Sequence, residues 1–320
     1  MKKAVVIGAT GGTGAAIVDE LVRRQIPVTA FGRSRAKLEQ LMLRSSSSGL
    51  ITLAVGDAFQ TKEVADVARG SDVLFHCANV PYHKMSEQLL PLGEAIMQAA
   101  EQLHVKVVAV DGIYPYGRRQ ADLITENHPK QPHTRKGKAR LQFGKMILSP
   151  RWNNAKPLIV RLPDYYGPTA NAASYLGATL RDIAANKPSF YIGNMRVPRE
   201  YVYLPDAANM IVEIATRDDA YHQEWHIPGG EIISGQHIVR IARAAAGSSK
   251  PVVPLGKISL SILGKFNPIL KEVVEMLYLT TEPLRLSKAK YETFIGPVPA
   301  TSFEEGISQT IRQLKLTKVE

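Results

Sequence analysis

Short apolar runs alternate with amphipathic stretches through the first half of the chain. Such runs are typical of parallel strands covered on both faces, and stretches with apolar residues every three or four positions are typical of surface helices. The predicted strands cover residues 4–7, 27–32, 50–55, 72–77, 105–110 and 157–162. The predicted helices between them cover residues 15–24, 61–68, 89–104 and 134–148. This order predicts an α/β fold built on a doubly wound parallel sheet.

The pattern becomes mixed from Asn171 onward, which predicts a second and smaller unit. Helices are expected over residues 172–185, over 206–216 with Asp206 as its N-cap, and over 234–246. The largely apolar stretch 258–279 predicts either two short helices that close the lobe or an oligomer surface. A strand near 224–228 is expected to return to the sheet. We therefore predict a sheet domain over residues 1–168 and a smaller, interleaved C-terminal substrate lobe over residues 169–320.

The composition is that of an ordinary soluble protein. The 320 residues are 45% hydrophobic and 22% charged, and no apolar stretch is long enough to cross a membrane. We therefore expect no membrane partner. Cys77 is the one cysteine, which excludes a disulfide framework and fits a reducing, cytoplasmic location. The eight histidines show no metal-binding spacing, so no metal site is expected.

The chain is strongly basic, with a net charge of +11, and this raises the question of nucleic acid. The cations are spread along the sequence, and no nucleic-acid-binding motif accompanies the local cluster at 135–140. Attraction of a phosphorylated small molecule explains the charge at least as well. We therefore expect a small-molecule partner and no nucleic acid.

Three glycines, Gly8, Gly11 and Gly14, lie between the first predicted strand and the first helix. Glycine permits positive φ in the tight turn and lets backbone N–H groups approach a pyrophosphate, which the positive end of the helix dipole also attracts. The spacing in this setting predicts a dinucleotide-binding turn. Its expected cofactor contacts are Gly8, Thr10, Gly11, Gly12, Thr13 and Gly14.

The residues after the second strand indicate which dinucleotide binds. A carboxylate there would accept a hydrogen bond from a ribose 2′-hydroxyl, whereas cations accommodate a 2′-phosphate. Arg33, Arg35 and Lys37 are all cationic, and no carboxylate precedes Glu39. We therefore predict NADP (NADPH) as the cofactor, with Arg33 and Lys37 as phosphate contacts.

Further cofactor contacts are expected where the next strands end. Asp57 and Ala58 follow the third strand and are placed to touch the adenine ring, and Ala78 and Asn79 follow the fourth strand, where small residues leave room for the central part of the cofactor. Tyr82 lies in the loop beyond them and is a candidate substrate contact.

Several motifs in the same order resemble an extended or atypical short-chain dehydrogenase/reductase of the NAD(P)-dependent epimerase/dehydratase-like branch. The motifs are the glycine turn, Gly56-Asp57, Tyr116-Gly117, the segment 160–168 and the segment 201–208. The resemblance covers nearly the whole chain. It implies a Rossmann-type domain, hydride transfer, a nicotinamide contact at Pro163, and a monomer or homodimer.

The resemblance also implies a Tyr-x-x-x-Lys pair and a Ser or Thr after the fifth strand, and here the chain departs from the pattern. The Ser or Thr position falls on Asp111, and the pair aligns as Thr134 and Lys138, so that the lysine is kept and the phenol is missing. A phenol could come from Tyr114, Tyr116, Tyr165 or Tyr166 instead. The catalytic candidates are therefore Lys138, which is also expected to hold the cofactor ribose, Tyr116 and Asp111.

Two functions of different classes follow. The first is an NADP-dependent oxidoreductase or epimerase-like enzyme with an atypical site acting on a small molecule, for which Tyr165, Arg196 and Arg199 join Tyr82 as substrate candidates. The second is a non-catalytic, NADP-binding redox sensor or regulator of the NmrA-like kind. The retained Lys138 and the substrate lobe favour the enzyme, and the missing phenol favours the regulator.

Overall fold

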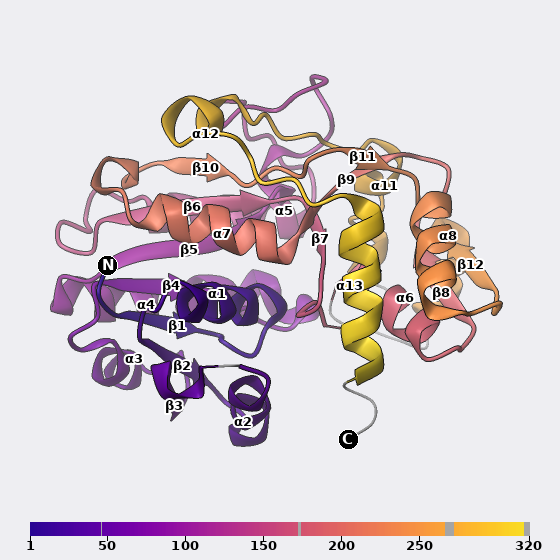
Figure 1. Cartoon of the computed structure of the whole chain (residues 1–320). Helices are drawn as coiled ribbons and strands as arrows, with labels where there is room; N and C mark the ends of the chain where they lie inside the picture. The colour runs from indigo at the N-terminus through magenta and orange to yellow at the C-terminus, as the bar shows by residue number, and fades with distance from the viewer. Residues whose placement is uncertain (46, 172–173, 266–271, 317–320) are drawn as a thin grey trace.

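A seven-stranded parallel sheet forms the larger part of the protein (Figure 1). The computed structural model describes residues 1–45, 47–171, 174–265 and 272–316. The strand order is β10-β6-β5-β4-β1-β2-β3, with β1 between β4 and β2. The strands are β1 (Ala4–Ile7), β2 (Val28–Gly32), β3 (Ile51–Val55), β4 (Val73–His76), β5 (Lys106–Gly112), β6 (Pro157–Leu162) and β10 (Glu224–His226). The predicted doubly wound sheet is therefore confirmed, and its direction of winding reverses beside β1.

Helices cover both faces of this sheet, and each face has its own apolar core. The helices α1 (Gly12–Arg23), α2 (Arg35–Leu43) and α7 (Leu204–Ala215) pack on one face, and α3 (Thr61–Ala68), α4 (Met85–Leu103) and α5 (Arg135–Ile147) pack on the other. The strands supply alternate residues to the two cores, as shown by Val6 on the first side and Val5 on the second. This explains why they read as continuous apolar runs.

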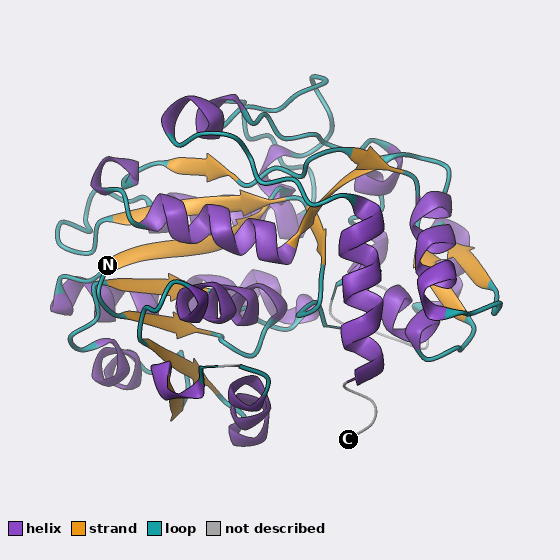
Figure 2. Ribbon diagram, viewed as in Figure 1, coloured by secondary structure: helices purple, strands orange, loops and turns teal. Residues whose placement is uncertain are grey.

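A smaller lobe lies beside the carboxyl edge of the sheet (Figure 2). Its strands form a three-stranded sheet in the order β11-β9-β7 and a pair, β12-β8. The strands are β7 (Asp164–Tyr166), β8 (Ser189–Ile192), β9 (Arg199–Tyr203), β11 (Ile232–Ile233) and β12 (Val252–Leu255). The helices of the lobe are α6 (Tyr175–Ala184), α8 (Gly235–Ala246), α9 (Lys257–Leu263), α11 (Tyr278–Thr281) and α13 (Phe303–Leu316), whereas α12 (Ala289–Phe294) packs beside β10 of the large sheet. Because β10 pairs with β6 in the large sheet, the chain crosses between the two parts more than once.

Some predicted boundaries differ from those observed. Asp206 is not an N-cap, because α7 begins two residues earlier, after Tyr203. The Asp206 carboxylate instead accepts hydrogen bonds from Thr301 N at 2.8 Å and Thr301 Oγ1 at 2.9 Å, which ties the first turn of α7 to the segment before α13. The predicted helix 172–185 starts at residues that lie outside the described ranges. Residues 266–271, which belong to the predicted stretch 258–279, also lie outside them. The division at residue 168 stays a prediction.

No described helix is both long and apolar enough to reach across a lipid bilayer. Among the described residues, no three His, Cys, Asp or Glu side chains come together in a way that would hold a metal ion.

Candidate functional site

The glycine turn between β1 and α1 is closed by contacts that leave no space for side chains. Gly8 has φ +84°, and a Cβ there would lie 2.6 Å from backbone atoms of Ala78 at the end of β4. A Cβ on Gly14 would lie 2.3 Å from the Gly8 carbonyl oxygen. Helix α1 begins at Gly12 with neither a side-chain cap nor an acidic residue in its first turn. Its first N–H groups are therefore open to an anion, which fits the pyrophosphate of a dinucleotide.

The residues after β2 present unneutralised positive charge beside this turn. Arg33 and Lys37 are exposed, and neither side chain has a partner among the described residues. The neighbouring carboxylate of Glu39 is paired with Arg35, with 2.8 Å between Oε1 and Nε. Both cations are thus available to a phosphate group.

The ends of β3, β4 and β6 place the other predicted cofactor contacts at the same edge of the sheet. Asp57 is partly buried, and its Oδ1 accepts a hydrogen bond from Phe59 N at 3.1 Å. Ala78 lies against Gly8, and the next residue, Asn79, accepts a hydrogen bond from Val80 N at 2.9 Å. Pro163 is buried directly after β6.

Helix α5 buries two cations, and neither of them is Lys138, the lysine that the motif predicts. Thr134 is the N-cap, and its Oγ1 accepts a hydrogen bond from Gly137 N at 3.0 Å, so its hydroxyl is committed to the helix start. Lys138 lies on the exposed face. Lys136 and Arg140 are 1% and 8% exposed and are four residues apart, on the face that meets the sheet. The placement of Lys138 gives no contact that supports its predicted role.

Asp111 belongs to a buried network of charges at the end of β5. Its Oδ1 lies 2.7 Å from Arg140 Nη1, and its Oδ2 lies 2.6 Å from Arg161 Nη1. Arg161 also pairs with Glu224 at 2.8 Å. Burial alone would raise the pKa of Glu224, but Arg161 and Lys130 lower it to about 2. Both Asp111 oxygens are thus held by guanidinium groups, which is a structural arrangement.

Tyr116 is enclosed rather than placed at the sheet edge. Its side chain has no exposed surface, and its hydroxyl lies 2.7 Å from His226 Nε2. Burial raises the pKa of this phenol and lowers the pKa of His226 to about 3, an effect that Arg161 strengthens. A predicted catalytic role for Tyr116 would require access that this packing does not provide.

Three other tyrosines meet at the carboxyl edge of the sheet, each from a different element. The hydroxyl of Tyr82 lies 3.0 Å from that of Tyr114, which follows β5, and 3.3 Å from that of Tyr175, the first residue of α6. All three are partly exposed. Burial raises the pKa of Tyr114, whereas the Tyr82 hydroxyl and the charge of Arg140 pull it down in part. We call Tyr82, Tyr114 and Tyr175 the tyrosine cluster.

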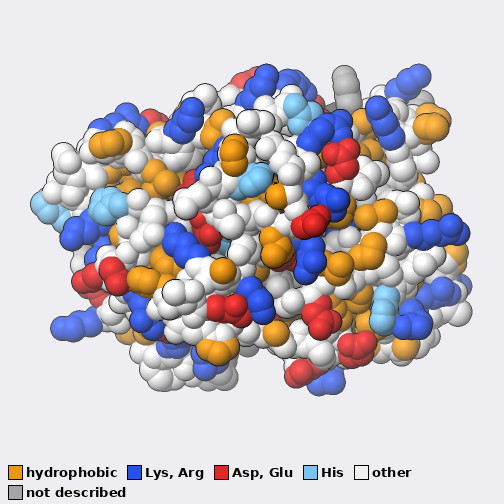
Figure 3. Space-filling model, turned by 90° about the horizontal axis from the view of Figure 1, so that it is seen from above, with side chains coloured by type: hydrophobic (Ala, Val, Ile, Leu, Met, Phe, Trp, Pro, Cys, Tyr) orange, Lys and Arg blue, Asp and Glu red, His pale blue; other side chains and the backbone are white. Residues whose placement is uncertain are grey.

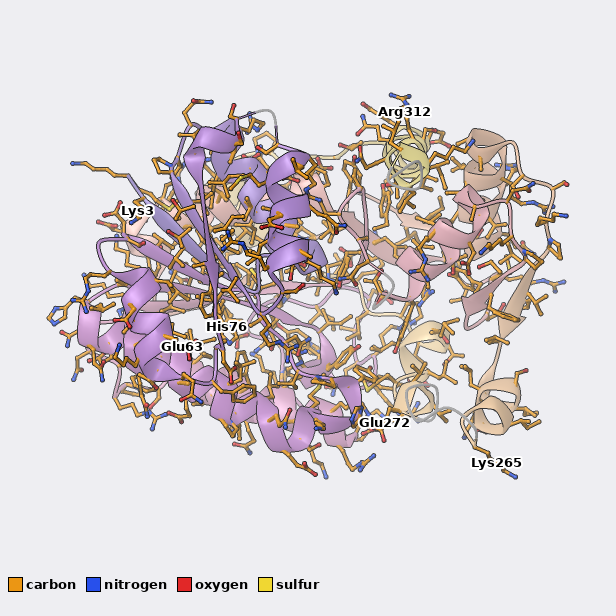
Figure 4. The ribbon with its side chains drawn as sticks, turned by 90° about the horizontal axis from the view of Figure 1, so that it is seen from below. Lys3, Glu63, His76, Lys265, Glu272 and Arg312 are labelled. Atoms are coloured by element: carbon orange, nitrogen blue, oxygen red, sulfur yellow. The ribbon has the colours of Figure 1, made fainter. Side chains whose placement is uncertain are left out.

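Lys136 closes one side of the tyrosine cluster. Its Nζ lies 4.7 Å from the centre of the Tyr82 ring, at cation–π distance, and it forms ion pairs with Glu272 and Glu275. Figure 4 shows Glu272 between the α5 side of the sheet and the lobe. The amine of Lys136 is therefore neutralised by these two carboxylates.

Arg140 keeps an unused donor near the tyrosine cluster. Its Nε is buried and has no hydrogen-bond partner in the described part of the chain, and the same holds for both ring nitrogens of His76 at the end of β4. Burial and the Arg140 charge lower the pKa of His76 to about 4. The imidazole beside Arg140 is therefore neutral at physiological pH.

The lobe contributes Arg199 and Tyr165 to the same region. Arg199 is 4% exposed, and its guanidinium lies 3.1 Å from Asp164 Oδ2 and donates to the Tyr191 hydroxyl at 2.7 Å. Burial raises the pKa of Tyr165 to about 12. Arg196 is exposed, and none of the described residues forms an ion pair with it. Of the two predicted arginines, only Arg199 is therefore built into the lobe.

A cavity of about 950 Å³ lies between the start of α5 and the lobe. Its lining includes Arg118, Arg135, Lys257, Asn194 and Tyr278. Leu277 also lines it and belongs to an apolar cluster on which Tyr82 and Tyr175 pack. The cavity therefore adjoins the tyrosine cluster.

Residues 8–138 match a family model described as NAD(P)H-binding. The chain carries an NAD(P)H-binding domain. The match begins at the first glycine of the turn and ends within α5, so it spans the predicted cofactor residues up to Lys138. A search of curated protein sequences found no match.

The NAD(P)H-binding domain and the lobe together share their fold with solved structures of epimerases and a dehydratase. UDP-glucuronic acid 4-epimerase from Bacillus cereus, in complex with NAD, is 16% identical, with a TM-score of 0.78 over 98% of this chain and 99% of that chain. The dTDP-glucose 4,6-dehydratase DesIV from Streptomyces venezuelae, with NAD and TYD bound, is 18% identical, with a TM-score of 0.78 over 99% and 98%. UDP-glucose 4-epimerase from Thermotoga maritima is 15% identical, with a TM-score of 0.77 over 99% of both chains.

The spacing of apolar residues along α5 could have identified the two buried cations that the motif alignment missed. Phe143 and Ile147 are apolar, and counting back from them by three or four residues reaches Arg140 and Lys136. This periodicity places both cations on the buried face of α5 and Lys138 on the opposite one. Tyr175 carried no such signal, because only the tertiary fold brings α6 to β5.

Proposed function

We propose that the protein is an NADP(H)-dependent oxidoreductase or epimerase-like enzyme whose proton donor is Tyr114. The observation that carries this proposal is the position of the Tyr114 phenol. It lies at the carboxyl end of β5, is hydrogen-bonded to Tyr82, and feels the charge of Arg140. A phenol becomes useful in proton transfer at neutral pH when a cation stabilises its ionised form. Arg140, on the same helix as Lys138, supplies that charge.

The choice of NADP rests on the surface after β2. A 2′-phosphate needs cations that are not already neutralised, and Arg33 and Lys37 meet that condition in the described structure. The carboxylate of Glu39, which would repel a phosphate, is held by Arg35. When bound, NADPH would supply the hydride, and the chain's own groups would handle the proton.

The proton step follows from the tyrosine cluster. Burial raises the pKa of Tyr114, so the phenol is protonated at neutral pH and acts as an acid. As a substrate carbonyl carbon accepts hydride, its oxygen gains a pair of electrons and takes the Tyr114 proton. The phenolate that remains is stabilised by the Arg140 guanidinium and by a hydrogen bond from the Tyr82 hydroxyl. The reverse sequence oxidises an alcohol.

The substrate class that we propose is an anionic small molecule such as a nucleotide-linked sugar. The solved structures of similar fold include complexes with UDP-glucuronic acid and UDP-glucose. In this chain the 950 Å³ cavity beside the tyrosine cluster is lined by Arg118 and Arg135, which are paired with Glu282 and Glu272, and by Lys257. Lys257 forms no ion pair with a described residue, so its amine is available to a phosphorylated ligand.

One observation favours the second function, a regulator that binds NADP without turnover. Thr134 is used as a helix cap and Lys138 is exposed, so the expected pair contributes no chemistry. A regulator would use the cofactor turn and leave Tyr114 without a catalytic role.

The first experiment is a fluorescence titration with NADPH, with NADH run beside it, followed by a screen of nucleotide sugars for changes in nicotinamide absorbance. Once turnover is seen, we expect Tyr114→Phe to lower kcat by about 100-fold or more while NADPH affinity is unchanged. Tyr203→Phe, which removes a distant phenol bonded to Gln309, is the matched control. NADPH binding with no turnover on any substrate favours the regulator, and failure to bind either nucleotide overturns both functions.

A further inference from the structure

One long segment of the lobe contains no acidic residue. Between Glu231 and Glu272 the sequence has neither Asp nor Glu, although the whole chain carries 29 of them. The same segment holds Arg240, Arg243, Lys250, Lys257, Lys265 and Lys271. Such an excess of one sign in a contiguous stretch points to a partner of the opposite sign.

The structure places exposed apolar side chains in and beside this basic segment. Val253 of β12 is 48% exposed, and its register partner on β8, Phe190, is 55% exposed. Ile258 and Ile262 of α9 are 80% and 56% exposed. Because these two are four residues apart, they lie on one face of the helix.

The opposite faces of the same elements are fully used in packing. Tyr191, next to Phe190 on β8, is buried, and Leu260, between the two isoleucines of α9, has no exposed surface. The outward Phe190, Val253, Ile258 and Ile262 are therefore not needed for the core of the lobe. Exposed apolar groups at neighbouring positions mark a surface that contacts something else.

Lysines surround these apolar groups without being neutralised. Lys187 precedes β8, Lys250 precedes β12, and Lys257 and Lys265 flank the exposed isoleucines of α9. All four are exposed and form no ion pair with any described residue. Asp182, the nearest acidic residue before β8, accepts a hydrogen bond from Ser189 Oγ at 3.1 Å. We call the four lysines together with Phe190, Val253, Ile258 and Ile262 the basic apolar surface.

The figures show where this surface lies on the molecule. Figure 3 shows blue and orange side chains, and no red ones, at the outermost right-hand part of the face that it presents, at the end that carries α8, β8 and β12. In Figure 4, Lys265 extends away from the body of the protein at that same end. The basic apolar surface is thus remote from the glycine turn and from β3.

We propose that the basic apolar surface docks the protein onto a membrane surface rich in anionic lipids. Isoleucine and phenylalanine side chains gain by entering the boundary between headgroups and acyl chains, and lysines keep their stems against apolar groups while their amines meet lipid phosphates. Each lysine near an anionic surface strengthens binding, and the effect weakens with salt.

The charge of this surface decides between lipid and a second copy of the chain. A symmetric dimer through the basic apolar surface would bring the four lysines of one protomer against those of the other, with no carboxylate between them. An acidic protein face would satisfy the lysines but would not bury four separated aliphatic and aromatic groups as readily as a lipid layer. An anionic bilayer provides phosphates for the lysines and an apolar layer for the four exposed apolar side chains.

The test is cosedimentation of the whole protein with vesicles of phosphatidylcholine alone or mixed with phosphatidylglycerol. We expect binding to the mixed vesicles at low salt, loss of that binding at high salt, and little binding to neutral vesicles. The double variant Lys250→Glu/Lys265→Glu, whose positions do not line the substrate cavity, should lower the partition coefficient by about tenfold or more. Lys2→Glu/Arg312→Glu changes the net charge equally on exposed side chains elsewhere and should bind nearly as the parent does.

A second pair of variants tests the apolar part. Ile258→Ser/Ile262→Ser should weaken binding severalfold at unchanged charge, whereas Leu43→Ser/Leu316→Ser, which removes apolar groups 82% and 61% exposed, should not. All of these positions are exposed, so circular dichroism and NADPH binding should stay unchanged. Absence of binding to mixed vesicles overturns the proposal and leaves an acidic protein as the partner of this surface. Equal weakening by the charge-reversed variant of the basic apolar surface and by Lys2→Glu/Arg312→Glu also overturns it, because the binding would then follow net charge alone.

Discussion

The glycine turn and the corner between β5 and α5 lie at the same edge of one sheet, yet they are specified in different ways. In the turn, the candidate site is made of backbone, and the contacts closest to Gly8 and Gly14 come from residues at the ends of the adjacent strands β1 and β4. At the corner, the candidate site is made of side chains, and the tyrosine cluster assembles from residues 82, 114 and 175. A local pattern can therefore describe the first region, whereas the second depends on how distant segments are brought together.

The largest effect is expected in the turn. In Gly14→Ala, the new Cβ would lie 2.3 Å from the Gly8 carbonyl oxygen, so the backbone must move and would displace the N–H groups to which we assign the pyrophosphate. We expect NADPH affinity to fall by about 100-fold or more, measured by fluorescence titration. Gly49→Ala is the control, because a Cβ there meets nothing within 4 Å. Undiminished affinity would show that the cofactor binds elsewhere.

A large loss of stability is expected when the charge network at the corner is broken. Asp111→Ala leaves Arg140 and Arg161 buried without the carboxylate that bridges them at 2.7 and 2.6 Å. Removing one partner of a buried ion pair costs about 3–5 kcal/mol of unfolding free energy, which urea titration measures. A variant that keeps its stability but loses turnover would give Asp111 the catalytic role that the sequence suggested.

The fold could be predicted from the sequence because its signals are local and repeated. Apolar runs give the strands of the large sheet, and the predicted strand over 157–162 and helix over 61–68 coincide with β6 and α3. Boundaries fail where tertiary contacts decide them. Asp206 looked like a cap, but its carboxylate is taken by Thr301, which lies far away in the sequence.

The candidate site was predictable only in its cofactor half. The glycines and the cations after β2 lie at the sheet edge where the sequence places them, whereas Lys138, which was chosen by motif spacing, lies on the exposed face of its own helix. Asp111 and Tyr116 were chosen by position at the end of β5, and their partners Arg161 and His226 come from β6 and β10. Burial and pairing of this kind have no trace in a single sequence.

The buried histidines of the corner predict an acid-sensitive fold. Burial, aided by nearby cations, lowers the pKa of His76 to about 4 and that of His226 to about 3, whereas an unfolded histidine titrates near 6.5. The unfolded chain therefore binds protons first, so the stability is complete above about pH 6.5 and falls as the pH drops toward 4. Each histidine contributes about 1.4 kcal/mol per pH unit in this window.

The contribution of Glu200 to stability has the opposite pH dependence, so it must be separated from that of the histidines. Burial raises its pKa to about 7, so its contribution is present at low pH and is lost as the pH rises from about 4.5 to 7. Comparing the parent with His76→Phe by urea unfolding at several pH values isolates one histidine. The variant should lose about one proton of pH dependence. An unchanged slope would mean that His76 is charged in the folded protein.

The smallest effect is expected at the rim of the turn, where the comparison between the two regions is sharpest. Arg33→Glu reverses an exposed charge that forms no hydrogen bond or ion pair with a described residue, so folding should be unaffected. A 2′-phosphate would meet repulsion in place of a charge-assisted hydrogen bond, and we expect NADPH affinity to fall by about tenfold while NADH affinity stays the same. Arg196→Glu, an exposed arginine on the lobe, is the control for net charge. If both nucleotides weaken equally, the cations after β2 act on the pyrophosphate that the two cofactors share, and the preference for NADP has no basis in this surface.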